Sequence, residues 1–247
     1  MPADFISSGR AVPSYSDKQM SEVDPNPDLL RSLGKLTRGL SALFWGLPAW
    51  LIISAETARA DGLGPAGVIP ALAVNLLLLY GLGQIGNFQK DERPWRNALD
   101  RVKLFGLINL GLCPFLFWFS RMPDQPFFRD SIVTLTLSAL MFLFNLNVVL
   151  KQLGMMLPDE ALRQEIRQFT ALNRWLLLLW LLGVMAAFAV PLLFDFRTHF
   201  SPLFRLWLQH LTTTVLLCLG LSPLAITMAL VWKIKEVIFH SIFGGRH

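Results

Sequence analysis

Six stretches of the sequence are apolar, free of Asp, Glu, Lys and Arg, and long enough to cross a lipid bilayer. They are Gly39–Ala55, Pro65–Asn87, Leu104–Ser120, Ser131–Leu150, Trp175–Phe194 and Leu206–Trp232. A helix that crosses the hydrocarbon core, which is roughly 30 Å thick, needs about 20 apolar residues, with a range of about 17–25. The stretches therefore predict an all-α integral membrane protein with six transmembrane helices in three hairpins.

The composition and the distribution of charge agree with this prediction. The chain is 53% hydrophobic and only 16% charged, whereas soluble domains carry about 25% charged residues. With the N-terminus placed in the cytoplasm, 17 of the 22 Lys and Arg residues fall on the cytoplasmic side. Cytoplasmic loops of membrane proteins carry such an excess of basic residues. We therefore expect both termini in the cytoplasm, a bacterial inner membrane location, and no nucleic acid partner despite the net charge of +5.

The predicted spans divide the chain into three regions. Residues 1–38 form a polar tail that ends in an amphipathic helix, residues 39–232 form the six-helix domain, and residues 233–247 form an amphipathic cytoplasmic segment. Similar amphipathic patterns occupy residues 91–103 and 159–174, so that one precedes each odd-numbered span. Basic amphipathic helices commonly lie in the headgroup layer. We therefore expect interfacial helices at these three places.

Residues 81–86 read GLGQIG and match the G-x-G-x-x-G spacing of dinucleotide-binding proteins. That fingerprint requires a strand, a glycine turn and a helix within a βαβ unit. Here the preceding residues are rich in Leu and form part of the predicted second span. Glycines in membrane helices usually allow neighbouring helices to approach closely. We therefore interpret these glycines as packing positions and predict no nucleotide site.

A short pattern recurs in the sequence. Residues 84–92 read QIGNFQKDE and residues 152–160 read QLGMMLPDE, at an offset of 68 residues. Each copy lies where an even-numbered span ends and an amphipathic segment follows. Two explanations are open at this point: a hairpin unit present three times, or a resemblance that the repeated topology imposes on any such chain.

The sequence offers few polar side chains within the spans. The candidates for a polar path or for ligand contacts are Asn75, Asn109, Asn145, His210 and Thr213. The alternative role for such side chains is hydrogen bonding between helices, which stabilises helix packing in membranes. His210 has no second His, Cys or carboxylate nearby in the sequence, so we predict no metal site. No cofactor can be assigned.

An enzymatic role has little support in the sequence. Glu56, Asp195, His199 and His210 are the residues that a membrane-embedded lipid-modifying enzyme could use for acid–base chemistry. No nucleophile, zinc-protease or phosphate-loop motif accompanies them. We therefore favour a non-catalytic protein.

Two candidate functions agree best with the sequence. The first is an accessory or scaffolding subunit of a larger membrane complex. The alternative is a permease component for a solute or lipid, driven by a separate cytoplasmic ATPase. Besides the lipid bilayer, we expect protein partners that contact the N-terminal tail and the cytoplasmic segments 91–103 and 159–174.

Overall fold

The computed structural model of the chain describes residues 27–58, 64–88, 92–122, 124–156, 160–193 and 202–243. Within these ranges, the side chains of residues 27–30, 64–65, 161–162, 187–193, 202–213, 216–217 and 240–243 fall outside this description. The elements are α1 (Pro27–Ala58), η1 (Gly64–Gly67), α2 (Val68–Ile85), α3 (Arg93–Leu112), α4 (Pro114–Arg121), α5 (Pro126–Met155), α6 (Glu160–Leu193) and α8 (Pro202–Phe243). Six helical segments, one of which comprises α3 and α4, are long and apolar enough to cross a membrane. For the described residues, the prediction of an all-helical chain with six helices able to span a membrane is thereby confirmed.

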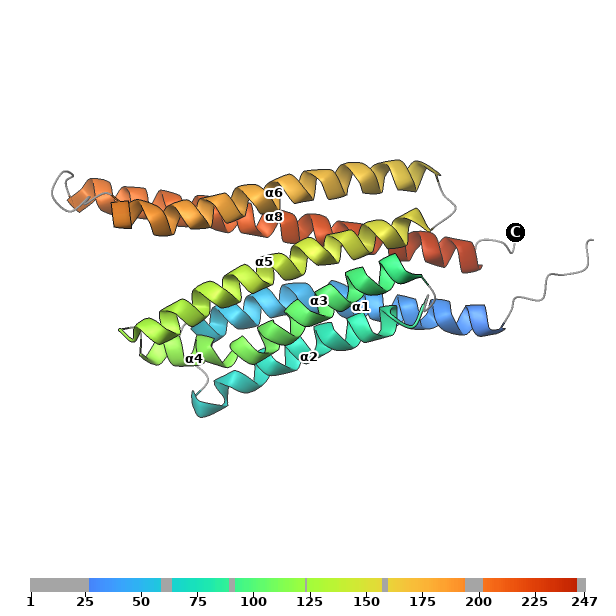
Figure 1. Ribbon diagram of the computed structural model, residues 1–247, viewed down its shortest axis with the longest axis horizontal. Coiled ribbons are helices and arrows are strands. Elements are labelled where there is room, and N and C mark those ends of the chain that lie inside the picture. The colour runs from blue at the N-terminus through green and yellow to red at the C-terminus, as the bar shows by residue number, and fades with distance from the viewer. Residues whose placement is uncertain are drawn as a thin grey trace, which may run out of the picture.

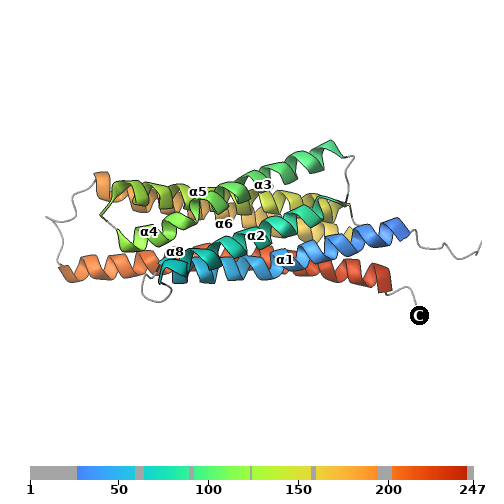
Figure 2. The same cartoon turned by 90° about the horizontal axis from the view of Figure 1, so that it is seen from below.

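The six spans pack as a ring that follows the chain order. Each span contacts its hairpin partner most extensively, in the pairs α1 with α2, α3 with α5, and α6 with α8. Contacts of α2 with α3, of α5 with α6 and of α8 with α1 join the three hairpins. The start of α1 and the end of α8 lie at the same end of the bundle, as Figures 1 and 2 show.

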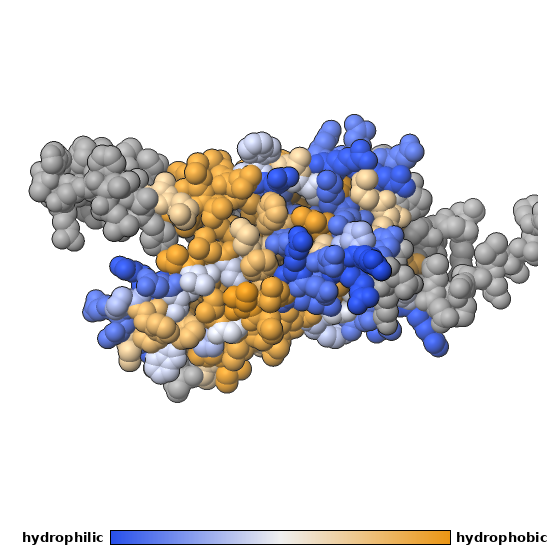
Figure 3. Space-filling model, in the orientation of Figure 1, coloured by the Kyte–Doolittle hydropathy of each residue, from blue (hydrophilic) through white to orange (hydrophobic). Residues whose placement is uncertain are grey.

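The outer surface of the bundle has the character of a membrane protein. Large apolar side chains are exposed along the spans, among them Leu76, Leu107, Leu179, Leu182 and Val215. On the face that Figure 3 shows, hydrophobic residues cover the middle of the bundle, while hydrophilic residues gather at the end where α1 begins. Side chains that are buried in a soluble protein can face outward here, because lipid is as apolar as they are.

The three amphipathic segments differ in structure from the interfacial helices that we expected. Each is continuous with the span that follows it; α6, for example, runs over 34 residues, or about 51 Å at 1.5 Å per residue. Part of each apolar stripe is also buried, since Leu36, Trp95 and Ile166 are each 0% exposed and belong to one hydrophobic core. These segments therefore extend the bundle and its core beyond the spans. In the segment at the start of α6, however, Phe169 and Leu172 are 37% and 51% exposed, so the interfacial location of these segments stays a prediction.

Two of the three glycines in GLGQIG have the predicted packing role. A Cβ atom added at Gly81 would lie 3.0 Å from the carbonyl oxygen of Gly39 in α1, and one at Gly86 would lie 2.7 Å from Leu99 Cδ2. Around Gly83, by contrast, an added Cβ would meet no atom within 4 Å. Gly81 allows close approach of α1 to α2, and Gly86 allows close approach of α3.

The recurring QIG and QLG patterns make the same kind of contact. Gly86 is covered by Leu99, and Gly154 is covered by Ile166. Leu99 and Ile166 occupy matching places, because each is the second apolar residue of the stripe that follows its glycine. The contact supports a structural equivalence between the two hairpin junctions. Whether it reflects an ancestral repeat stays a prediction.

A break in the third span coincides with Pro114. The proline has no backbone N–H and cannot continue the helical hydrogen-bond ladder. The thiol of Cys113 donates to the carbonyl oxygen of Leu110 at 3.2 Å, so it occupies the acceptor that the proline leaves free. Cys113 is buried and unpaired, and it serves here as a small side chain with a weak donor.

The side of the membrane on which each end lies is a prediction that cysteine labelling tests. We expect Gln125→Cys, between α4 and α5, to react with a membrane-impermeant maleimide in intact cells. Gln164→Cys, near the start of α6, should react only after permeabilisation. Both positions are exposed, and both variants carry Cys113→Ser and Cys218→Ser to remove the native thiols. Labelling of Gln164→Cys in intact cells would contradict the predicted orientation.

Candidate functional site

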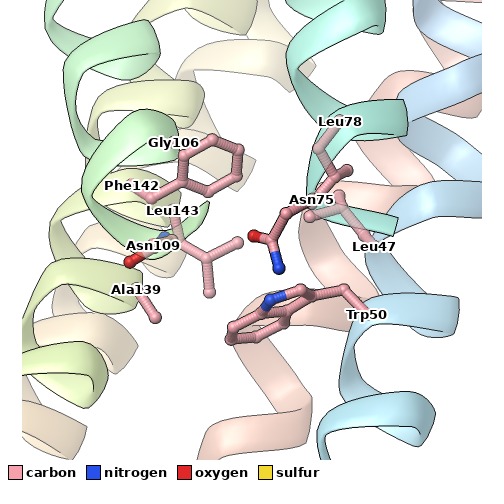
Figure 4. A pocket seen from close by; sticks show the side chains of 9 residues that line it. All are labelled: Leu47, Trp50, Asn75, Leu78, Gly106, Asn109, Ala139, Phe142 and Leu143. Atoms are coloured by element: carbon pink, nitrogen blue, oxygen red, sulfur yellow. The ribbon is translucent and has the colours of Figure 1, made fainter. Parts of the chain in front are cut away.

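Asn75 and Asn109, two of the predicted polar candidates, meet at one cavity near the middle of the bundle. The cavity lies among α1, α2, α3 and α5, and Trp50, Leu78 and Phe142 also line it (Figure 4). Both asparagines are 3% exposed although they are 34 positions apart in the sequence. The structure therefore joins these two candidates.

The cavity has room for about one small molecule such as water. Its volume is about 10 Å³, close to the roughly 10–15 Å³ that a single water requires by this measure. The side-chain amide of Asn75 donates to the carbonyl oxygen of Ala71 at 2.8 Å, while Oδ1 of Asn109 is buried without a hydrogen-bond partner. The polar side chains that line the cavity are neutral amides and an indole, which can hold a polar atom.

Replacing Asn109 by leucine tests whether the cavity holds a tightly bound polar partner. Leucine is similar in size, and the buried Oδ1 atom has no partner to lose. We expect the free energy of unfolding to change by less than about 1 kcal/mol, since removing an unsatisfied polar group is close to neutral. Thermal unfolding in detergent measures this change. A loss of about 3 kcal/mol or more would show that a bound partner depends on this amide.

Asn145 does not belong to this cavity. Its amide donates to the carbonyl oxygen of Met141 in its own helix at 2.7 Å, and the side chain is half-buried. His210 and Thr213 lie in α8, but their side chains are outside the description. The structure thus brings together two of the five candidates.

A second polar cluster joins three spans, and the sequence analysis did not identify it as a site. It consists of Asn147 of α5, Asn173 of α6 and Thr227 of α8, which are 5%, 0% and 0% exposed. Nδ2 of Asn173 donates to Oδ1 of Asn147 at 2.8 Å and to the hydroxyl of Thr227 at 2.9 Å. Nδ2 of Asn147 also donates to the hydroxyl of Thr227, at 3.3 Å. One polar group from each helix therefore meets the other two.

The sequence contained a signal for this cluster. Asn173 shares a stripe with Ile166, Thr170 and Leu177, all buried and spaced by four, three and four residues. A polar residue on such a stripe points into the protein and needs a hydrogen-bond partner there. Asn173 falls in the segment 159–174, which was expected to lie at the interface, so it was not considered among the polar side chains of the spans.

The residues considered for acid–base chemistry are not assembled into a site in the described part of the chain. Glu56 lies in the last turn of α1, whereas Asp195 and His199 fall outside the described residues. Among the residues that the structure describes, no group of three or more His, Cys, Asp or Glu side chains could hold a metal ion.

Comparison with known proteins identifies no relative from which a function could be proposed. The chain matches no known protein family, no curated protein sequence and no solved structure.

Proposed function

We propose that this chain is a non-catalytic accessory subunit of a larger complex in a bacterial inner membrane. In this proposal the spans form a rigid membrane unit, and their cytoplasmic extensions bind a protein partner. The observation that carries the proposal is the bonding of Asn147, Asn173 and Thr227 to one another across three helices. Polar side chains used in this way stabilise helix packing.

Other polar side chains in the spans support the same role. The hydroxyl of Thr134 donates to Asp130 O and that of Thr136 to Ile132 O, both within α5. The amides of Asn75 and Asn145 also bond to carbonyl oxygens of their own helices. Polar groups that already have a hydrogen-bond partner in their own helix cost little free energy in the membrane. They need no bound solute as a further partner.

The cytoplasmic extension of α6 offers a surface suited to an acidic partner. Arg163 and Arg167 are four residues apart and line a surface depression of about 400 Å³, together with Glu160 and Gln164. Guanidinium groups bind carboxylates through paired hydrogen bonds. Complementary charge on the two surfaces of an interface increases the rate and specificity of association.

Site-specific photo-crosslinking in living cells tests this proposal. We expect a photoreactive phenylalanine analogue at Gln164 to give one discrete heavier product, and the substitutions Arg163→Glu and Arg167→Glu to reduce that product at least tenfold. The same analogue at Gln125, which is exposed at the other end of the bundle, serves as the control. Failure of both positions to crosslink, or identical products at both, would contradict a specific cytoplasmic partner.

A permease component is the second candidate, and the cavity of Asn75 and Asn109 is the observation that favours it. A crosslinked product that contains a cytoplasmic ATPase would support this alternative. The double substitution Asn75→Leu and Asn109→Leu would then abolish transport while leaving the complex assembled.

A further inference from the structure

A groove of about 380 Å³ lies between the start of α3 and the end of α5. Small-molecule sites usually occupy about 300–1,000 Å³, so the groove is large enough for a ligand. The side chains that carry the argument are Glu92, Trp95, Val148, Lys151, Gln152 and Met155. The groove is separate from the cavity of Asn75 and from the depression on α6.

The groove crosses the predicted boundary between lipid and cytoplasm. Val148, Lys151, Gln152 and Met155 follow the spacing i, i+3, i+4 and i+7, which places them on one face of α5. The apolar stretch of this span ends at Leu150, and Lys151 is the first charged residue after it. One part of the groove is therefore at the level of the acyl chains and the other at the level of the headgroups.

Two residues of the groove carry buried polar atoms that lack hydrogen-bond partners. These atoms are Nε1 of Trp95, whose side chain is 0% exposed, and Oε1 of Gln152. Buried polar atoms are nearly always paired in folded proteins, because an unpaired one costs about 1–3 kcal/mol. A ligand that supplies an acceptor and a donor would satisfy both atoms.

The side chains of the groove determine which ligand fits. Lys151 and the indole of Trp95 only donate hydrogen bonds, whereas the carboxylate of Glu92 and Oε1 of Gln152 accept them. The matching ligand carries an anionic acceptor and a cationic donor within one small group. A solely anionic headgroup would meet the carboxylate of Glu92, and a choline headgroup has no N–H to donate.

We propose that this groove binds the phosphoethanolamine headgroup of a membrane phospholipid. Lys151 and Trp95 hold the phosphate, and the partial positive charge at the start of α3 favours it there. Glu92 and Gln152 hold the primary ammonium group, while Val148, on the membrane side of Lys151, contacts the acyl chains. This site does not depend on the accessory role proposed above, since a subunit or a permease could carry it equally.

Native mass spectrometry of the delipidated full-length protein tests the proposal with a methylation series. The probes are phosphatidylethanolamine, its N-monomethyl and N,N-dimethyl forms, and phosphatidylcholine, all with identical acyl chains. Each methyl group removes one N–H donor and leaves the phosphate unchanged. We expect one bound phosphatidylethanolamine per chain and a stepwise fall in retention, to at least tenfold weaker binding of phosphatidylcholine.

Single substitutions distinguish the two halves of the groove. We expect Glu92→Gln to abolish the preference for phosphatidylethanolamine over phosphatidylcholine. Lys151→Gln and Trp95→Phe should weaken binding of all four lipids about three- to tenfold, because they remove phosphate donors. Arg101→Gln is the matched control, since Arg101 is exposed on α3 and does not line the groove. Unfolding temperatures establish that each variant is folded.

Four results would overturn the proposal. Equal retention across the methylation series would show binding through the acyl chains alone. An unchanged preference in Glu92→Gln, together with unchanged binding in Lys151→Gln, would place any lipid site elsewhere. Unchanged binding in Trp95→Phe would show that Nε1 of Trp95 does not hold the phosphate. Competition by free phosphoethanolamine at low millimolar concentration would instead assign the same groove to a soluble ligand and overturn the lipid as its occupant.

Discussion

Replacing Gly39 by alanine is expected to lower the free energy of unfolding by about 1–3 kcal/mol, which is typical of overpacking in a close-packed core. The Cβ atom of alanine would lie 2.7 Å from the carbonyl oxygen of Gly81 and 2.7 Å from Ile85 Cγ1. A backbone oxygen cannot rotate away as a flexible side chain can. The substitution therefore pushes α1 and α2 apart at their crossing.

Gly83→Ala is the matched control for this prediction. Gly83 belongs to the same GLGQIG motif as Gly81, but an added Cβ would meet no atom within 4 Å. We expect its stability to be unchanged, or higher by up to about 1 kcal/mol through the better helix propensity of alanine. Steric trapping in bicelles measures both free energies. Equal losses at Gly39 and Gly83 would contradict the packing role assigned to the glycines.

The second large effect is expected in the cluster that joins α5, α6 and α8. Asn173→Ala removes both hydrogen bonds that its amide donates and leaves a cavity, so we expect a loss of about 2–4 kcal/mol. Thr227→Val keeps the shape of the side chain but removes the acceptor for Asn147 and Asn173. Its expected cost is about 1–2 kcal/mol.

Thr136→Val provides the control for the cluster. The Thr136 hydroxyl bonds to Ile132 O of its own helix and joins no other span, so the expected loss is below about 0.5 kcal/mol. A double-mutant cycle between Asn173→Ala and Thr227→Val should show a coupling of about 1 kcal/mol. Additive effects of the two substitutions would mean that the side chains do not act together.

The sequence was sufficient to predict the six helices because hydrophobic length alone decides whether a segment can cross a bilayer. It also predicted the packing role of Gly81, since glycine is the residue that lets two backbones approach. It could not distinguish Gly81 from Gly83. That distinction depends on which side of α2 faces α1, and both sides of α2 are equally apolar.

The candidate sites were less predictable for a related reason. The meeting of Asn75 and Asn109 depends on the lateral order of the helices, which hydropathy does not encode. Asn173 was not among the candidates, because it falls in the amphipathic segment 159–174 that was expected at the interface, although its own stripe is buried. The groove at Trp95 combines the start of one helix with the end of another, and only the packed hairpin brings them together.

The mass of the intact assembly is the most direct test of the proposed role. The untagged chain would be extracted at natural abundance from its own cells in mild detergent and measured by native mass spectrometry. The account predicts a stable complex of fixed stoichiometry that contains at least one different subunit. A monomer, or an oligomer of this chain alone, would contradict the accessory role.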